Sequence, residues 1–141
     1  MIKRLRSWFS NIGFLLVMLV ILDLFLQRYF RNIDFGVLNR GVSFGLLPGM
    51  GQVIAIAVYL ALVVFLGLKR RTSTTPTRID LAIWLLAAGG LGNLFPRLFW
   101  SGVWDYIRVP LLPFWFNISD LMIMAGLVSY ILRGDGNSDS V

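Results

Sequence analysis

The chain has 141 residues, of which 57% are hydrophobic and only 14% are charged, and its formal net charge is +6. A soluble domain carries roughly 25% charged residues, so this composition indicates a membrane protein. The sequence has no Cys and no His, which excludes disulfides, thiol nucleophiles, Ser–His pairs and a His-ligated zinc site. It also has no Glu, so any acid–base chemistry depends mainly on seven Asp residues.

Apolar stretches dominate the chain and predict an all-α membrane protein with four transmembrane helices, because a bilayer crossing needs about 20 apolar residues. The stretches are Trp8–Leu26, Gly51–Leu68, Ile79–Phe95 and Asn117–Leu132. No small-residue cleavage pattern follows the first stretch, so we expect a retained helix and not a signal peptide. The third helix is expected to stop near Pro96. Residues 1–132 are predicted to form one domain, followed by a disordered polar tail at 133–141.

Two irregular segments separate these helices, at Arg28–Met50 and Leu98–Phe116. Alternation of Val42, Phe44 and Leu46 with small residues predicts short strands. The basic residues cluster at the N-terminus and between the second and third apolar stretches, on the side opposite to the two irregular segments. Because basic residues are enriched on the cytoplasmic side, this predicts both termini in the cytoplasm and both irregular segments on the outer face. We interpret the aromatic residues of these segments as an interfacial belt, namely Tyr29, Phe30, Trp100, Trp104, Tyr106 and Trp115.

Polar residues gather at one predicted depth, near the outer leaflet. They are Asp23, Asn39, Asn93, Arg97, Asp105, Asn117 and Asp120. An ionisable group inside a membrane span is costly and is a candidate functional residue by default. Other interpretations stay open: Asp23 as an interfacial or Arg28-paired residue, Asp105 as a loop residue in water, and Asp120 as a helix cap in competition with Asn117 and Ser119.

Two carboxylates can hydrolyse a peptide bond without a metal. The ionised one takes a proton from water, while the protonated one polarises the carbonyl and then helps to protonate the leaving amine. Like charges so close together cannot both ionise cheaply, so the pair titrates as a unit. Asp105 and Asp120 come from different segments and could face each other in this way.

The motifs around these residues occur in an order that resembles the lipoprotein signal peptidase family, also called signal peptidase II. Asp23 in LDLFLQ is similar to its first-helix Asp, and Asn39–Leu46 to its Asn-x-Gly-x-(Ala/Ser)-Phe segment. Gly89–Arg97 is similar to its Gly-Asn-x-x-Asp-Arg motif. Gly102–Ile107 and Phe116–Asp120 are similar to the two motifs that carry its catalytic Asp residues.

This resemblance implies an aspartyl endopeptidase that cuts diacylglyceryl-modified prolipoproteins just before the lipid-modified Cys, at the outer face of the bacterial inner membrane. Asp105 and Asp120 would be the catalytic dyad, with Asn39, Gly41, Arg97 and Asn117 binding substrate or positioning the dyad, and Asp23 and Asn93 supporting the site. The segment Asn39–Leu47 would form a small extramembrane β-cradle, and Leu98–Pro113 an outer flap. We expect a monomer that contacts membrane lipid, needs no cofactor or metal, and binds no nucleic acid.

The chain departs from the family pattern at four positions. Gln27 stands where the family has Lys, Pro96 where it has Asp, Ser119 where it has Ala, and Leu121 where it has Ser. If Gln27 and Pro96 are degraded support positions, restoring Lys and Asp should be tolerated or mildly helpful. A homologue with weakened activity, a small proton-coupled transporter that uses Asp23, and a non-catalytic interaction protein remain alternatives.

Overall fold

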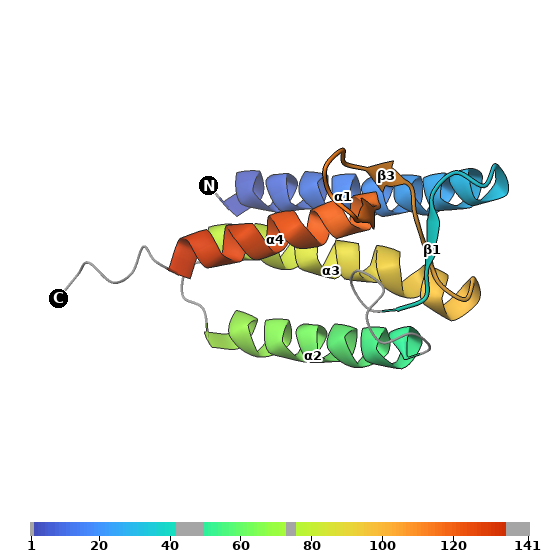
Figure 1. Ribbon diagram of the computed structural model, residues 1–141. Coiled ribbons are helices and arrows are strands. Elements are labelled where there is room, and N and C mark those ends of the chain that lie inside the picture. The colour runs from blue at the N-terminus through green and yellow to red at the C-terminus, as the bar shows by residue number, and fades with distance from the viewer. Residues whose placement is uncertain (1, 42–49, 73–75, 135–141) are drawn as a thin grey trace.

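The protein is described by a computed structural model, which covers residues 2–41, 50–72 and 76–134. In these ranges it is mostly helical, as predicted. The helices are α1 (Ile2–Asn32), α2 (Gly51–Thr72), α3 (Pro76–Phe99) and α4 (Ile118–Gly134). They lie along one long axis (Figure 1). Helix α3 is central, because it packs against α1, α2 and α4.

Two of the helices contain stretches that are long and apolar enough to cross a membrane, Asn11–Asn32 in α1 and Leu81–Phe99 in α3. The apolar parts of α2 and α4 are shorter, at Val53–Phe65 and Ile118–Leu132. Large apolar side chains on α1 point outward, with Phe14 67% and Phe25 65% exposed. Such a surface suits contact with acyl chains, because lipid tails are as apolar as the side chains themselves.

Small residues bring α3 and α4 close together. A Cβ atom added at Gly89 would collide with the backbone of Ser119, and one added at Gly92 would collide with the Ser119 side chain. A Cβ atom added at Gly126 would also come too close to the carbonyl oxygen of Ala82, at 2.9 Å. Close backbone approach through small residues is a common way for membrane helices to pack, and here it places the start of α4 against the C-terminal half of α3.

Helix α3 does not stop at Pro96, which corrects the prediction from sequence. It continues to Phe99 with Pro96 inside it. Proline removes one backbone donor, but only three helical residues follow, so little of the helix depends on it. The Pro96 carbonyl accepts hydrogen bonds from Trp100 N at 2.7 Å and Gly102 N at 3.3 Å, which close the helix end.

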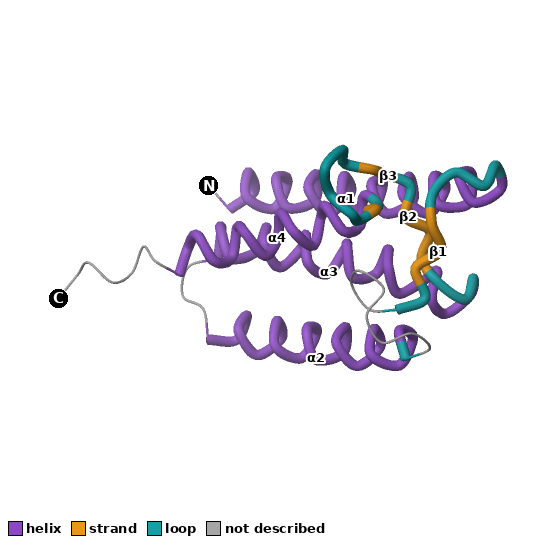
Figure 2. The backbone as a smooth tube through the Cα atoms, in the orientation of Figure 1, coloured by secondary structure: helices purple, strands orange, loops and turns teal. Residues whose placement is uncertain are grey.

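Short strands connect the helices, with β1 and β2 towards one end of the bundle and β3 beside the middle of α1 (Figure 2). β1 (Val37–Asn39) pairs antiparallel with β2 (Val103–Asp105), with Val37 opposite Asp105 and Asn39 opposite Val103. β3 (Ile107–Arg108) pairs antiparallel with β4 (Trp115–Phe116). The strands predicted around Val42, Phe44 and Leu46 lie outside the described residues.

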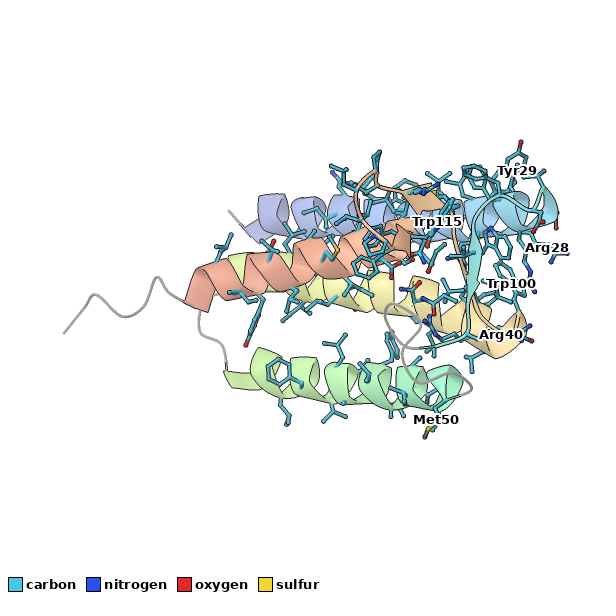
Figure 3. All side chains as sticks on the ribbon, viewed as in Figure 1. Arg28, Tyr29, Arg40, Met50, Trp100 and Trp115 are labelled. Carbon is cyan, nitrogen blue, oxygen red and sulfur yellow. The ribbon has the colours of Figure 1, made fainter. Side chains whose placement is uncertain are left out.

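Two of the residues predicted for the aromatic belt lie inside the protein. Figure 3 shows Arg28, Tyr29, Arg40 and Trp100 gathered at one end of the bundle, and Tyr29 is 49% exposed. Trp104 and Tyr106 are buried instead. Trp104 lies in β2, which packs against α1, and Tyr106 directly follows that strand. Their polar atoms bond inside the protein: Trp104 Nε1 donates to the Phe35 carbonyl at 2.8 Å, and the Tyr106 hydroxyl donates to Asp23.

Candidate active site

Two carboxylates from separate elements line one cavity. Asp105 is the last residue of β2, and Asp120 lies in the first turn of α4. The lining residues are Asn39, Asn93, Arg97, Val103, Asp105, Trp115, Phe116, Asp120, Ile123 and Met124. The cavity therefore combines two acids, two amides and one guanidinium with an apolar wall, which is the mixture expected of a ligand-binding site.

Asp105 is held by two side-chain amides. Asn39 Nδ2 donates to Oδ2 at 3.1 Å, and Asn117 Nδ2 donates to Oδ1 at 2.7 Å. Burial raises the pKa of Asp105 from 3.8 to about 7, and the negative charge of Asp120 adds to this rise. The two amide hydrogen bonds and the charge of Arg97 oppose it. Asp105 can therefore keep a proton close to neutral pH.

Asp120 is fixed by α3 and by the start of its own helix. Asn93 Nδ2 donates to Oδ1 at 2.7 Å, and the backbone N–H of Asn117 donates to Oδ2 at 3.1 Å. In return, Asp120 N donates to Asn117 Oδ1 at 2.9 Å. This reciprocal pair is a capping box, so Asn117 is the cap and Asp120 is its third-position partner. The carboxylate thus faces the cavity while it also stabilises the helix start.

Arg97 ties the site to the loop that follows β1. Its Nη1 donates to the Asn93 carbonyl at 2.9 Å, and its Nη2 donates to the Gly41 carbonyl at 3.0 Å. Gly41 N in turn donates to Asn39 Oδ1 at 3.1 Å. This local turn orients the Asn39 amide so that its nitrogen points to Asp105. The buried guanidinium also supplies a positive charge beside the two acids.

Asp23 lies behind the cavity and is fully buried. Its Oδ1 accepts hydrogen bonds from the Tyr106 hydroxyl at 2.7 Å and from Ile118 N at 3.1 Å. Its Oδ2 accepts from Ser119 N at 3.2 Å, from the Ser119 hydroxyl and from Gln27 Nε2 at 2.9 Å. The residues next to Asp105 and Asp120 in sequence are thereby attached to a single carboxylate on α1.

Gln27 and Tyr106 also hold Asp23 in place, and the sequence did not predict either of these contacts. Gln27 is fully buried, and its Oε1 accepts from Trp104 N at 3.3 Å while its Nε2 donates to Asp23. Burial, and next the neighbouring Asp23, raise the pKa of Tyr106, so its hydroxyl remains a donor. The available signal was the i, i+4 spacing of Asp23 and Gln27, which places both on one face of α1.

Apart from Asp23, the residues predicted for the site form one connected hydrogen-bond network in the structure. Asn117 bonds to Asp105, Asn93 and Asp120, while Arg97 and Gly41 hold Asn39. Asp23 joins the network through Ser119, the neighbour of Asp120. Such an arrangement can keep one proton between two coupled acids and orient their remaining oxygens towards a bound water or carbonyl.

Comparisons with known proteins agree with this geometry. Residues 15–134 match the family described as Signal peptidase (SPase) II. The chain is 34% identical over 130 residues to the lipoprotein signal peptidase of Methylobacterium radiotolerans, covering 83% of this chain and 75% of that protein. It is 33% identical over 135 residues to the lipoprotein signal peptidase of Syntrophomonas wolfei, covering 86% and 87%. Another match, to the lipoprotein signal peptidase of Methylorubrum extorquens, is 37% identical over 106 residues and covers 70% of this chain and 61% of that protein.

The fold is shared with a solved bacterial membrane enzyme, determined by the in meso method at 1.9 Å resolution. The TM-score is 0.71 at 24% identity, over 92% of this chain and 95% of the other. A helical membrane fold with a family match to a peptidase places the protein in the class of aspartic-type membrane peptidases. Within that class, the chain belongs to the signal peptidase II family.

Proposed function

We propose that the protein removes signal peptides from diacylglyceryl-modified prolipoproteins, cutting before the lipid-modified Cys, with Asp105 and Asp120 as its catalytic dyad. The observation that carries this proposal is that the two acids come from β2 and α4, line one cavity and are bridged by Asn117. The proposal is further supported by relatives described as lipoprotein signal peptidases. Family membership does not favour the alternative of a proton-coupled transporter.

In the mechanism, the dyad carries one proton before the substrate reacts. Because burial raises the pKa of Asp105 to about 7, we assign this proton to Asp105 and the role of ionised base to Asp120. Asp120 takes a proton from a water molecule, which attacks the scissile carbonyl, while the acid on Asp105 polarises that carbonyl. The proton accepted by Asp120 then goes to the leaving amine as the tetrahedral intermediate collapses. No metal or cofactor is needed for these steps.

The surrounding residues hold the two acids in place during this cycle. Asn39 and Asn93 each donate to one carboxylate, and Arg97 with Gly41 sets the orientation of Asn39. Asp23 anchors the chain next to each acid, through Tyr106 beside Asp105 and through Ser119 beside Asp120. Donors already fixed in the free enzyme do not have to reorganise in the transition state, which lowers the barrier.

For the membrane arrangement, we infer that all four helices cross the bilayer, with both termini in the cytoplasm and the cavity near the outer face. The shorter apolar stretches of α2 and α4 pack against α3, which itself is long enough to cross. We expect a monomer that binds prolipoprotein and membrane lipid and no nucleic acid. Labelling of single cysteines at Arg4, before the first span, and at Asp34, after it, from each side of sealed vesicles tests this orientation.

Purified protein in detergent should cleave a diacylglyceryl-modified prolipoprotein, and Asp105→Asn and Asp120→Asn should each abolish cleavage while the protein stays folded. Asp34→Asn is the matched control, because Asp34 is exposed and has φ 55°, a conformation that Asn tolerates well. Full activity in either dyad variant would refute the mechanism. A folded wild-type protein without activity would identify a weakened homologue.

A further inference from the structure

The β3–β4 hairpin ends in an exposed apolar tip, defined here as Val109–Leu112. Val109 is 39% exposed, Leu112 is 46% exposed, and Leu111 is fully exposed at 102%. Single exposed apolar residues are common on protein surfaces, but a contiguous group marks an interaction surface. The tip carries no charged side chain, so an apolar environment suits it better than water.

The backbone of the tip makes Leu111 an unexpected residue at its position. Leu112 N donates to the Val109 carbonyl at 3.2 Å and closes a four-residue turn with Pro110 in its second position. Leu111 occupies the third position with φ 78°. Turns of this type favour Gly or Asn there, because a side chain strains the backbone at positive φ. A strained Leu that touches little of the protein indicates that its side chain acts on the surroundings.

The depth of the hairpin shows what those surroundings are. Both of its ends are attached to Asp23, through the Tyr106 hydroxyl at 2.7 Å and Ile118 N at 3.1 Å. Asp23 lies within the stretch Asn11–Asn32, which is long and apolar enough to cross a membrane. The exposed Arg28, five residues further along α1, marks the polar side, so Asp23 lies about 7 Å deeper along the helix.

The figures also place the hairpin away from the end of the bundle that carries Arg28 and Tyr29. The loop between β3 and α4 lies beside the middle of α1 along the long axis of the bundle, and not beyond its end (Figure 2). Trp115, in β4, lies further into the bundle than Arg28 and Tyr29 (Figure 3). A loop at this depth in a membrane-spanning protein meets lipid wherever the protein does not cover it.

We propose that the tip Val109–Leu112 inserts into the outer leaflet of the bilayer as an apolar anchor beside α1. The base of the hairpin fits this position, because the Arg108 guanidinium lies 5.7 Å from the centre of the Trp115 ring. A flexible Arg side chain can extend towards lipid phosphates while its stem stays in an apolar region, and Trp is enriched at the membrane interface. The anchor holds the chain between Asp105 and Asp120 at a fixed depth.

The experiment uses the natural absence of Cys in this chain. Leu111→Cys is labelled with an environment-sensitive fluorophore and placed in lipid nanodiscs, with Phe14→Cys as a lipid-facing control and Asp34→Cys as an exposed control beyond the end of α1. We expect the label at position 111 to be quenched by lipid-borne spin labels and protected from aqueous iodide, as at position 14. Iodide quenching equal to that at position 34 would overturn the proposal. Neither result depends on peptidase activity.

A second measurement separates membrane insertion from packing within the protein. In a labelled Leu112→Cys background, Leu111→Gly removes the most exposed apolar side chain and relieves the positive φ. We expect several-fold weaker quenching by lipid spin labels, with an equal or higher midpoint of thermal unfolding in detergent. Unchanged quenching together with a lower unfolding midpoint would overturn the proposal, since Leu111 would then stabilise the protein itself.

Discussion

The side-chain amide nitrogen of Asn117 lies 2.7 Å from Asp105 Oδ1, although Asp105 ends β2 and Asn117 immediately precedes α4. The same side chain caps α4 through the backbone N–H of Asp120. One residue therefore starts the helix that carries one acid and donates a hydrogen bond to the other acid. Helix capping and the geometry of the dyad depend on each other at this point, and they can be separated by choice of substitution.

Asn117→Ser should lower kcat while leaving the protein folded. Serine is also a good N-cap, but it cannot donate to Asp105 and Asn93 as the amide does. A hydrogen bond between neutral groups contributes about 0.5–1.5 kcal/mol, so loss of the bond to the protonated Asp105 should lower kcat by roughly 2- to 10-fold. Asn117→Ala should lose the cap as well, which costs about 1 kcal/mol of stability. Wild-type kcat in the Ser variant would contradict this role.

Cleavage should decrease as the pH rises through about 7. The pKa of Asp105 is raised to about 7, mainly by burial and also by Asp120, and the proposed mechanism needs the proton held there. Loss of this proton leaves two ionised acids, and the general acid disappears. The pH profile of kcat/KM should therefore have an alkaline limb with a midpoint near 7.

Asn39→Ala should move this alkaline limb to higher pH. The Asn39 amide donates to Asp105 Oδ2 and lowers the pKa of that carboxyl, so its removal raises the pKa further. Arg40→Ala, an exposed neighbour on the same loop, is the control and should leave the limb in place. A shift to lower pH in Asn39→Ala would show that the amide stabilises the protonated form instead.

Stability should depend on pH through the same group. Because the folded pKa of Asp105 exceeds its ordinary value of 3.8, the folded protein binds this proton more tightly than the unfolded chain does. Its stabilising contribution is complete below pH 3.8 and is lost as the pH rises to about 7, an effect of roughly 4 kcal/mol. Thermal unfolding of Asp105→Asn in detergent should lack this dependence; an identical pH dependence in both proteins would exclude Asp105 as its source.

The four helices and the polar residues of the cavity were predictable because each leaves a local signal. Apolar stretches mark the helices in the sequence, and the acids stand out against them. Pro96 misled the prediction, since proline is compatible with a helix that ends three residues later. Trp104 and Tyr106 were assigned to the interface by residue type, whereas their burial depends on contacts with Phe35 and Asp23, far away in sequence.

Gln27 is the clearest case of a residue whose role depends on contacts that are distant in sequence. Its exchange for the Lys of the family looks like lost support when only the sequence is considered. In the structure both polar atoms of its amide form hydrogen bonds. The nitrogen donates to Asp23, and the oxygen accepts from the backbone N–H of Trp104, next to Asp105. The Ser119 hydroxyl is a further neutral donor to the same carboxylate. The pairing of a glutamine on α1 with a serine on α4 cannot be inferred from either position alone.

Gln27→Lys should therefore destabilise the protein, contrary to the expectation from sequence. An ammonium group can donate to Asp23 but cannot accept from Trp104 N, and an unsatisfied buried donor costs about 1–3 kcal/mol. Gln27→Met, of similar size, removes both hydrogen bonds and is the matched control. We expect a lower unfolding midpoint for both variants, with Lys the less affected because its charge pairs with Asp23. Cleavage by Gln27→Lys should fall along with this loss, because Trp104 N no longer positions Asp105. Wild-type stability and activity in Gln27→Lys would show that the bond between Gln27 and Trp104 contributes nothing to the site.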